Sequence, residues 1–265
     1  ACDFESQEMR TWAEACSVIV GRSVLAERYR RNPEFDPHTA FAAAQLLGIS
    51  EEEALARKKA GDPEIKKARQ SSKIPNFALP GGMGVWGLIG YARQNYGLKW
   101  RDAENCGGCR RGQEAGSREH SCFASRVRDA WYHQWPEARG YFAHTASIAD
   151  GNATLVHLYT GRVRGGVTFT SASNSIFQGL AADASKRALW RVVRACFDPS
   201  LGSPLLGCRP WAFVHDETIV EAPEDRAAEA AEEQKRLHEE AMQPLTPHVP
   251  ARAASSLMRS WSKGA

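Results

Sequence analysis

Acidic residues near the two ends of the sequence could hold a divalent cation. Asp3 follows a short apolar stretch and precedes a helical pattern, whereas Asp216 and Glu217 occupy the centre of the largely apolar segment VHDETIV. A buried carboxylate costs free energy unless it is paired or bound to a metal. Mg²⁺ commonly takes one or two protein carboxylates and leaves its other positions to water and phosphates. A fold that places Asp3 beside Asp216 would create a magnesium site; the alternative is that Asp216 and Glu217 form an outward-pointing turn.

A basic segment could bind phosphate groups. Lysine and arginine dominate from Arg57 to Lys73. Arg69, Lys73 and Phe77 are four residues apart, so they share one face of a helix. Two cations and a ring on one face suit a nucleoside triphosphate, because the charges meet the phosphates and the ring meets the sugar and base. The alternative is a solvated charged helix in which Phe77 packs inward. Pro75 is expected to kink this helix.

The composition is that of an ordinary globular protein. The chain has 265 residues, of which 43% are hydrophobic and 25% charged, enough for one large domain or two smaller ones. A net charge of +3 does not by itself indicate nucleic acid. No apolar run approaches the roughly 18–20 residues that cross a bilayer, so no membrane is expected. Scattered cysteines without a secretory signal favour reduced thiols and a cytoplasmic location.

The elements that must position these residues form a helix-rich α/β pattern. Strand character is expected at residues 1–4, 155–159, 163–169 and in a hairpin at 211–220. Helices are expected at 6–17, 51–60, from 63 onward, 86–96, 123–135, 137–149, 171–197 and 221–242, the last as a solvated outer face. Asp36 is expected to cap an Ala-rich helix that ends at Gly48, and the tail from Pro244 is expected to be a loop.

These motifs together resemble those of family A DNA polymerases, the class of bacterial DNA polymerase I and its phage relatives. DFESQEMR resembles motif A, RQSSKIPNFALPGG resembles motif B and VHDE resembles motif C. DPH resembles the family's Asp-x-His, and ASNSIFQGLAAD resembles the Asn-x-x-x-Gln-Gly segment that contacts the minor groove of the primer–template. The motifs follow the family's order, and the likeness runs from Ala1 to about Pro250.

The resemblance implies a role for each matched residue. It assigns metal binding to Asp3, Asp216 and the backbone carbonyl of Phe4, with Glu217 as an adjacent acid. It assigns nucleotide binding to Glu8, His38, Arg69, Lys73, Phe77 and Gly81, and DNA contacts to Asn174, Gln178 and His215. Glu8 would exclude a ribose 2′-hydroxyl, and Phe77 in place of Tyr implies poor use of dideoxynucleotides.

The implied reaction is template-directed attack of a primer 3′-hydroxyl on the α-phosphorus of a dNTP. Two Mg²⁺ ions would support it, with primer–template DNA and dNTPs as partners. Arg69 would grip the γ-phosphate, and Lys73 would meet the α- and β-phosphates and protonate the leaving pyrophosphate. Two positions depart from the family's pattern: Gly81 stands where many members carry Tyr, and Thr170 stands where bacterial members often carry Arg. The Pro80-Gly81-Gly82 run resembles phage-type members, which suggests a phage or prophage origin.

The resemblance also divides the chain. Residues 1–20 and 153–265 correspond to the palm, and residues 21–152 to the fingers with motif B helix 63–81 and a cysteine-containing loop 98–122. The second palm portion contains a primer-contact helix at 171–197 and the motif C hairpin at 211–220. The family's thumb and upstream palm precede motif A, so this chain is expected to act with a missing N-terminal portion.

Two other functions remain open at this point. The chain could be a non-catalytic or complementation-dependent DNA-binding fragment. It could also be a single-subunit RNA polymerase, which Glu8 and Glu217 disfavour.

The loop contains a set of side chains that zinc could bind. Its potential ligands are Cys106, Cys109, His120 and Cys122. The His-x-Cys half is tighter than usual zinc spacing, so structural zinc is not favoured. The preferred interpretation is a reduced loop with Arg110 and Arg111 near DNA phosphates.

Overall fold

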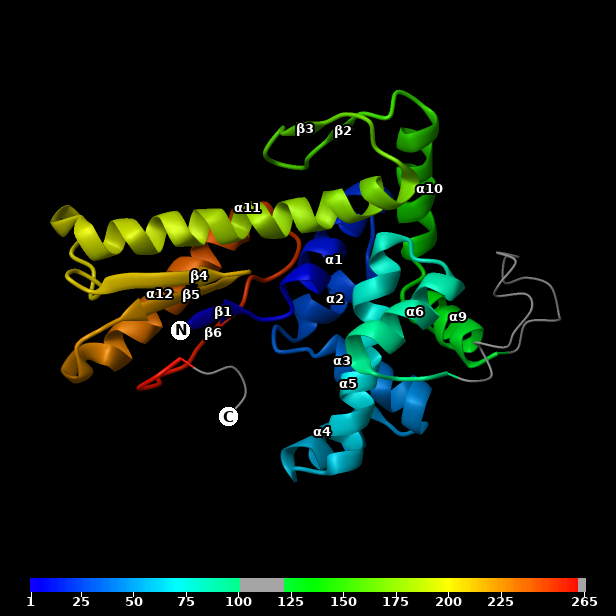
Figure 1. The fold of residues 1–265 in the computed structure, drawn as a ribbon, viewed down its shortest axis with the longest axis horizontal. Coiled ribbons are helices and arrows are strands. Elements are labelled where there is room, and N and C mark those ends of the chain that lie inside the picture. The colour runs from blue at the N-terminus through cyan, green and yellow to red at the C-terminus, as the bar shows by residue number, and fades with distance from the viewer. Residues whose placement is uncertain (101–121, 262–265) are drawn as a thin grey trace.

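The computed structural model describes residues 1–100 and 122–261, in which a small sheet lies beside a larger group of helices (Figure 1). The sheet contains β1 (Cys2–Phe4), β4 (Arg209–Val214), β5 (Glu217–Glu221) and β6 (Ala253–Ser255) in the order β4-β5-β1-β6. Each neighbouring pair is antiparallel. Segments from opposite ends of the sequence therefore meet in one sheet, because β1 lies between the β4–β5 hairpin and β6.

The hairpin brings the second acid toward the first. Its register leaves His215 and Asp216 as a two-residue turn, in which His215 has a φ of 58°. Positive φ at such a turn matches the twist of the flanking strands. Cys2 pairs with Thr218. This pairing places Asp3 of β1 close to the turn that carries Asp216.

Two long helices, α11 (Phe169–Phe197) and α12 (Ala227–Met242), pack against each other and against the sheet. Figure 1 shows the C-terminal part of α11 running along the strands and its N-terminal part extending past them over α1. A shared apolar cluster joins Phe4 of β1, Leu180 and Ala184 of α11, and Met242 of α12. Small alanines on α11 let it approach the sheet closely, so the polar residues on its neighbouring face are held at a defined distance from β1.

The buried face of α11 is a stripe of residues that lie four positions apart. The helix begins with a capping box between Thr168 and Ser171. The buried stripe consists of Ile176, Leu180, Ala184, Ala188 and Val192. The stripe fixes which face of α11 turns toward the sheet and α12.

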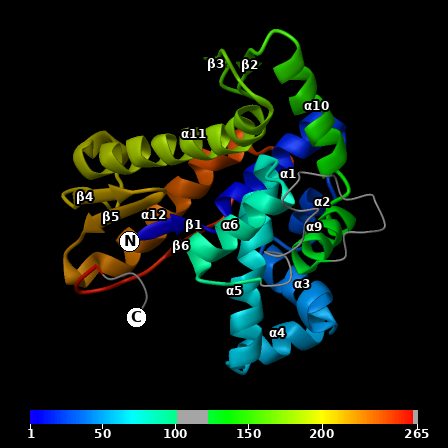
Figure 2. The same ribbon diagram turned by 45° about the vertical axis from the view of Figure 1, so that its right-hand side comes forward.

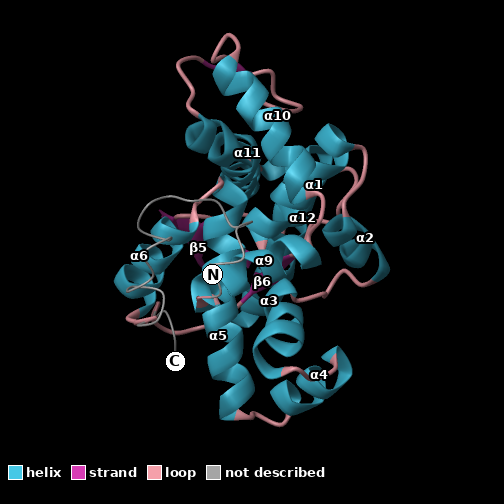
Figure 3. Ribbon diagram, turned by 90° about the vertical axis from the view of Figure 1, so that its right-hand side faces the viewer, coloured by secondary structure: helices cyan, strands magenta, loops and turns pink. Residues whose placement is uncertain are grey.

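The remaining helices form a separate group at the other end of α11 (Figure 2). They are α1 (Gln7–Val20), α2 (Val24–Arg31), α3 (Pro37–Phe41) with a π-helical turn (Ala42–Leu47), α4 (Glu51–Lys59), α5 (Pro63–Ala78) with a 3₁₀ turn (Leu79–Gly81), α6 (Val85–Tyr96), α9 (Phe123–Gln134) and α10 (Ala138–Asp150). Their core contains Trp12, Trp131 and Tyr141, with ring centroids 5.3 Å apart for the first two. Figure 3 shows α5 projecting from this group toward α4. Within the described ranges, no helix has the length and apolar character needed to cross a bilayer.

Three expectations from the sequence differ from the structure, and the first concerns the strands expected at 155–159 and 163–169. Only β2 (Leu155–Val156) and β3 (Val163–Arg164) form. A tight turn follows β2, in which Thr160 N donates to Leu158 O at 2.7 Å. The second strand is cut short because Thr168 caps α11, so Phe169 is already helical.

The acidic helix and the C-terminal tail also differ from their predictions. The helix starts at Ala227 after a 3₁₀ turn (Glu224–Arg226), and it is not a purely solvated face, because Leu237 and Met242 are buried. The tail is not entirely loop, since β6 pairs with β1 through Asp3 and Ala254. A three-residue strand of small residues has no periodic signal, and only its partner strand makes it a strand.

Arg10 of α1 ties three distant segments together. Its side chain is 1% exposed. The guanidinium donates to the carbonyls of Glu5 at 2.8 Å, Pro250 at 2.7 Å and Pro33 at 2.6 Å. It also lies 4.3 Å from the centre of the Tyr29 ring. In the sequence, Arg10 is only the last residue of the stretch DFESQEMR that resembles motif A. In the structure it joins α1 to the end of β1, to the segment after α2 and to the segment before β6.

Replacing Arg10 with Lys should therefore destabilise the fold. A single ammonium cannot reach three carbonyls in different directions, so we expect Arg10→Lys to lower the free energy of unfolding by about 3 kcal/mol. Urea denaturation followed by circular dichroism measures this loss. Arg259→Lys is the control, because the Arg259 side chain is 91% exposed; its change should stay within about 0.5 kcal/mol. Similar losses in both variants would contradict the prediction.

Candidate active site

Asp3 and Asp216 lie together at one end of the sheet. Asp3 Oδ1 is buried and has no hydrogen-bond partner among the described residues. Burial, followed by the charge of Asp216, raises the pKa of Asp3 to about 7. Glu217 is only 8% exposed and adds to the repulsion at Asp3. Trp261 Nε1 donates to Glu217 Oε2 at 3.4 Å. The site thus concentrates negative charge around an oxygen that lacks a protein donor.

The residues at this end of the sheet fit a divalent cation. Oxygen donors suit Mg²⁺, and a cation would relieve the repulsion between the two acids. Across the described residues, no three acidic, histidine or cysteine side chains cluster as a ready-made metal site. A cation here must therefore complete its coordination with ligands other than these side chains.

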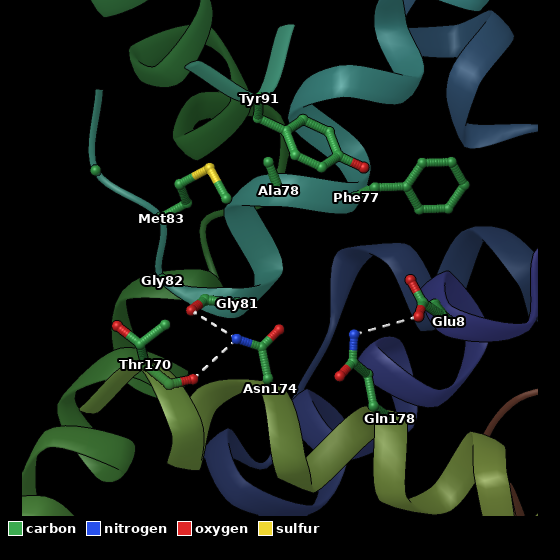
Figure 4. A pocket seen from close by; sticks show the side chains of 11 residues that line it. Glu8, Phe77, Ala78, Gly81, Gly82, Met83, Tyr91, Thr170, Asn174 and Gln178 are labelled. Carbon is green, nitrogen blue, oxygen red and sulfur yellow. Dashed lines mark hydrogen bonds between the residues drawn. The ribbon is translucent and has the colours of Figure 1, made fainter. Parts of the chain in front are cut away.

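Two neighbouring cavities share part of their lining. One has a volume of about 590 Å³ and reaches His215 and Asp216. The other, between α5, α6 and α11, has a volume of about 470 Å³ and is drawn in Figure 4. Glu8, Phe77 and Gln178 line both. Of the predicted nucleotide and DNA residues, those that line one or both cavities are Glu8, Phe77, Gly81, Asn174, Gln178 and His215. His38, Arg69 and Lys73 are not part of either lining.

Glu8 is held in the shared lining by α11. Gln178 Nε2 donates to Glu8 Oε1 at 3.3 Å, as Figure 4 shows. The neighbouring Gln7 donates to Ala181 O at 3.1 Å and to Ser185 Oγ at 2.9 Å, which fixes the first turn of α1 on α11. Burial raises the pKa of Glu8, and the hydrogen bond from Gln178 opposes that shift. Glu8 is thus a positioned carboxyl at the junction of the two cavities.

Asp36 organises the cations of α4 and α5. Its carboxylate caps α3, accepting from His38 N at 3.0 Å. Asp36 Oδ2 also accepts from Arg69 Nε at 2.6 Å and from Lys58 Nζ at 2.8 Å. Burial acts to raise the pKa of Asp36, but the charge of Arg69 and the hydrogen bonds from Lys58 and Arg69 outweigh it, so the pKa lies well below its usual range. Burial and the charge of Arg69 lower the pKa of Lys73.

His38 is buried rather than exposed to the cavities. Its side chain is 3% exposed, its Nδ1 lies 3.1 Å from Asn76 Nδ2, and its ring is 5.2 Å from that of Phe77. Burial lowers the pKa of His38 to about 4, so the ring is uncharged at neutral pH. Asn76 Oδ1 also accepts from Trp131 Nε1 at 3.1 Å. In this structure His38 and Asn76 position Phe77 from behind.

Gly81 lies against Asn174 of α11. Asn174 Nδ2 donates to Thr170 O at 2.9 Å and to Gly81 O at 3.4 Å (Figure 4). A Cβ built on Gly81 would lie 2.7 Å from Asn174 Nδ2 and 2.8 Å from Asn174 Cγ. The missing side chain at Gly81 is therefore what allows the end of α5 to contact α11.

The structure brings most of the predicted site residues together, but sequence reasoning missed two that matter. Asn76 lies between matched motif positions and has no periodic signal of its own. Tyr91 of α6 lines the smaller cavity. The sequence signal that could have pointed to Tyr91 is Gly81, which stands where many members of the family carry a Tyr ring. The roles of the predicted residues stay predictions.

Three of the four potential zinc ligands named from the sequence, Cys106, Cys109 and His120, lie outside the described residues. Cys122 immediately precedes α9 and is buried in a cluster with Ile89 and Ala124.

Comparisons with known proteins agree with the resemblance. No family profile matches the chain. It is 24% identical over 262 residues to DNA polymerase I of Aquifex aeolicus, covering 98% of this chain and 38% of the relative. It is 28% identical over 258 residues to DNA polymerase I of Deinococcus radiodurans, covering 93% of this chain and 22% of the relative. The chain thus spans less than half the length of these relatives.

A solved structure shares the fold. The POL domain of Pol1 from M. smegmatis, in complex with DNA primer-template and dNTP, matches with a TM-score of 0.64 and 22% identity, covering 98% of this chain and 39% of that chain. The predicted helix-rich α/β fold of a polymerase domain is confirmed, and so is the resemblance to DNA polymerase I.

The contact at Gly81 predicts a coupled effect of two substitutions. Gly81→Ala should lower the free energy of unfolding by about 1–3 kcal/mol, because the new Cβ overlaps the Asn174 amide. Asn174→Ala should remove most of this loss when combined with it, giving a non-additive double-mutant cycle in urea denaturation. Gly90→Ala is the control, since no atom lies within 4 Å of its Cβ position. Additive losses would show that the overlap does not exist.

The ion pairs of Asp36 predict a pH-dependent stability. The folded pKa lies below the ordinary value of 3.8, so the stabilisation is present above that pH and is lost as the pH falls below it. Asp36→Asn keeps a capping side chain but should cost about 2 kcal/mol at pH 7, allowing for the exposure of Lys58. The gap from the unsubstituted chain should shrink below pH 3.8, as measured by urea midpoints. Glu224→Gln, at an 86% exposed side chain, is the control and should leave the urea midpoint unchanged both at pH 7 and below pH 3.8. A difference between Asp36→Asn and the unsubstituted chain that does not depend on pH would refute the role assigned to the Asp36 ion pairs.

Proposed function

We propose that this chain is the polymerase portion of a DNA polymerase I-like enzyme, which transfers a nucleotidyl group from a dNTP to a primer 3′-hydroxyl under the direction of a template. The observation that carries the proposal is the meeting of Asp3 and Asp216, with a buried and partnerless Asp3 oxygen. Asp216 lines the larger cavity together with Glu8 and Phe77. The likeness to two DNA polymerase I proteins supports it.

Asp3 and Asp216 would hold Mg²⁺, together with the backbone carbonyl of Phe4. Glu217 lies close enough to affect the pKa of Asp3, and its contact with Trp261 keeps it oriented. When bound, two Mg²⁺ ions would lower the pKa of the attacking hydroxyl and neutralise charge on the leaving phosphates. Zinc has no role in this proposal.

The cations of α5 would bind the triphosphate. Asp36 accepts from Arg69 Nε, which anchors the guanidinium by one side and sets its direction toward a γ-phosphate. The lowered pKa of Lys73 suits transfer of a proton to the leaving pyrophosphate. Phosphoryl transfer depends mainly on positioning and charge neutralisation, and these two side chains supply both.

Glu8 would select the sugar. Gln178 holds its carboxyl between the two cavities, where it would crowd a ribose 2′-hydroxyl. The proposed substrate is therefore a dNTP rather than an NTP. Phe77 borders the same space, backed by His38, and would lie against the sugar and base.

The DNA would lie along α11 and the hairpin. Gln178 and His215 line the larger cavity, on the side where a primer terminus must approach the acids. Asn174 would contact the minor groove through its carbonyl oxygen, because its amide nitrogen already donates to Thr170 and Gly81. Residues 1–20 and 153–265 would form the palm and residues 21–152 the fingers.

A further portion of the protein would complete the DNA grip. The chain covers 38% and 22% of the two relatives, and we assign the thumb and upstream palm to the part they have in addition. Phosphate contacts provide most of the affinity for DNA. The chain alone should therefore bind primer–template weakly.

Primer extension with Mg²⁺ tests the proposal. The assay uses the chain with and without a supplied N-terminal portion, and compares dNTPs with rNTPs. Asp216→Asn should lower extension by at least about a hundredfold, because a metal contributes several kcal/mol to charge stabilisation. Asp225→Asn, at an exposed acid, should extend as the unsubstituted chain does. Undiminished extension by Asp216→Asn, or DNA binding without extension in every arm, would overturn the catalytic assignment.

A further inference from the structure

The smaller cavity has an aromatic side to which a residue outside the matched motifs, Tyr91, contributes. Its lining combines a polar side formed by Glu8, Asn174 and Gln178 with an apolar side formed by Phe77 and Tyr91. Figure 4 shows the Tyr91 ring beside α5, with its hydroxyl directed toward the Phe77 side. A cavity with flat rings on one side and hydrogen-bonding groups on the other suits a flat, polar-edged ligand.

The two glycines that follow α5, Gly81 and Gly82, cannot be replaced by a residue with a ring here. A Cβ at Gly81 would overlap Asn174, and a Cβ at Gly82 would lie 2.6 Å from Phe169 Cε1. Gly82 also has a φ of 76°, a conformation that side-chain-bearing residues rarely adopt. The side chains of Asn174 and Phe169 occupy the space beside these two glycines, so the second ring of the cavity comes from another element.

The same glycines bring Tyr91 into place. Gly82 reverses the chain in the left-handed region, Gly84 precedes α6, and α6 then returns beside α5. Tyr91 falls on the cavity side of α6. The Tyr96 ring packs behind it, with centroids 5.9 Å apart. Tyr91 is thus held by its own helix while its ring stays partly exposed.

The electrostatic surroundings keep the Tyr91 ring neutral. Burial raises the pKa of its hydroxyl, and the negative charge of Glu8 raises it further. Tyr91 and Glu8 line the same cavity. The Tyr91 ring also packs against the helical core but stays partly exposed, whereas Leu88 and Ala92 of the same helix are fully buried.

We propose that Tyr91 is a specificity-determining residue on whose ring a base of the nascent base pair stacks. The inference rests on the proposed polymerase function and adds to it the residue that bounds the base. Aromatic rings bind bases by stacking on their flat faces, and a correctly paired base presents a flat face of fixed position. A mismatched pair is displaced and stacks less well, so Tyr91 contributes to selectivity as well as to affinity.

The test compares ring, hydroxyl and bulk at this position. Steady-state primer extension by the whole chain, with the N-terminal portion supplied where extension requires it, gives the KM for the correct dNTP and the ratio of correct to mismatched incorporation. Tyr91→Leu should raise the KM about tenfold and lower the ratio by a similar factor. Tyr91→Phe keeps the ring and should stay within about twofold. Tyr132→Leu, at a half-buried tyrosine of α9, is the matched control and should leave both values unchanged.

The outcomes separate this inference from the proposed function. Unchanged KM and ratio in Tyr91→Leu, with active unsubstituted chain, overturn the role of Tyr91 alone. Failure of the unsubstituted chain to extend a primer overturns the proposed function. In that case, equilibrium binding of dATP to the chain with a dideoxy-terminated primer–template tests whether the Tyr91 ring binds a base. Binding weakened about tenfold by Tyr91→Leu but retained by Tyr91→Phe supports the stacking role, and equal or absent binding in all variants removes it. Circular dichroism melting checks that each variant is folded. If Tyr91→Leu is unfolded, Tyr91→Phe alone decides: a change of about tenfold in its KM and incorporation ratio, as large as that expected for Tyr91→Leu, contradicts a role of the ring.

Discussion

The pairing of β1 with β5 is the constraint on which the site depends. Through Cys2 and Thr218 it brings two carboxylates from opposite ends of the sequence together, although their charges repel. Burial of Asp3 makes that repulsion costly, as its raised pKa records. The strands, and the apolar cluster of Phe4 with α11 and α12, must supply the free energy that holds the acids in place. A cation at the Asp3 oxygen would then stabilise the fold as well as serve the reaction.

The helix α11 connects this pair of acids to the rest of the site. One stripe of the helix packs on the sheet, and a neighbouring face carries Asn174 and Gln178 toward the cavities. Gln178 holds Glu8, and Asn174 meets the glycine at the end of α5. A single helix thus connects the acids, Glu8 and the smaller cavity.

Several matched residues do structural work that the motifs do not reveal. Asp36 caps α3 while it anchors Arg69 and Lys58. His38 is buried and neutral and supports Phe77. Arg10 joins three chain segments through their carbonyls. In each case the charged or polar side chain is placed by burial among backbone groups, which a linear motif cannot show.

The sequence by itself determined the family resemblance, the helices with strong periodicity and the identity of the acids, cations and ring, because these depend on local spacing and on residue type. The buried stripe of α11 and the cap at Asp36 followed from the same local rules. Tertiary structure alone decided that β6 is a strand, that α12 buries one face and that Tyr91 closes the cavity beside Gly81. These features depend on contacts between residues far apart in the chain. Whether a side chain is buried, paired or exposed to a cavity is set by the partner that the fold brings to it, and that partner has no signature in the neighbouring sequence.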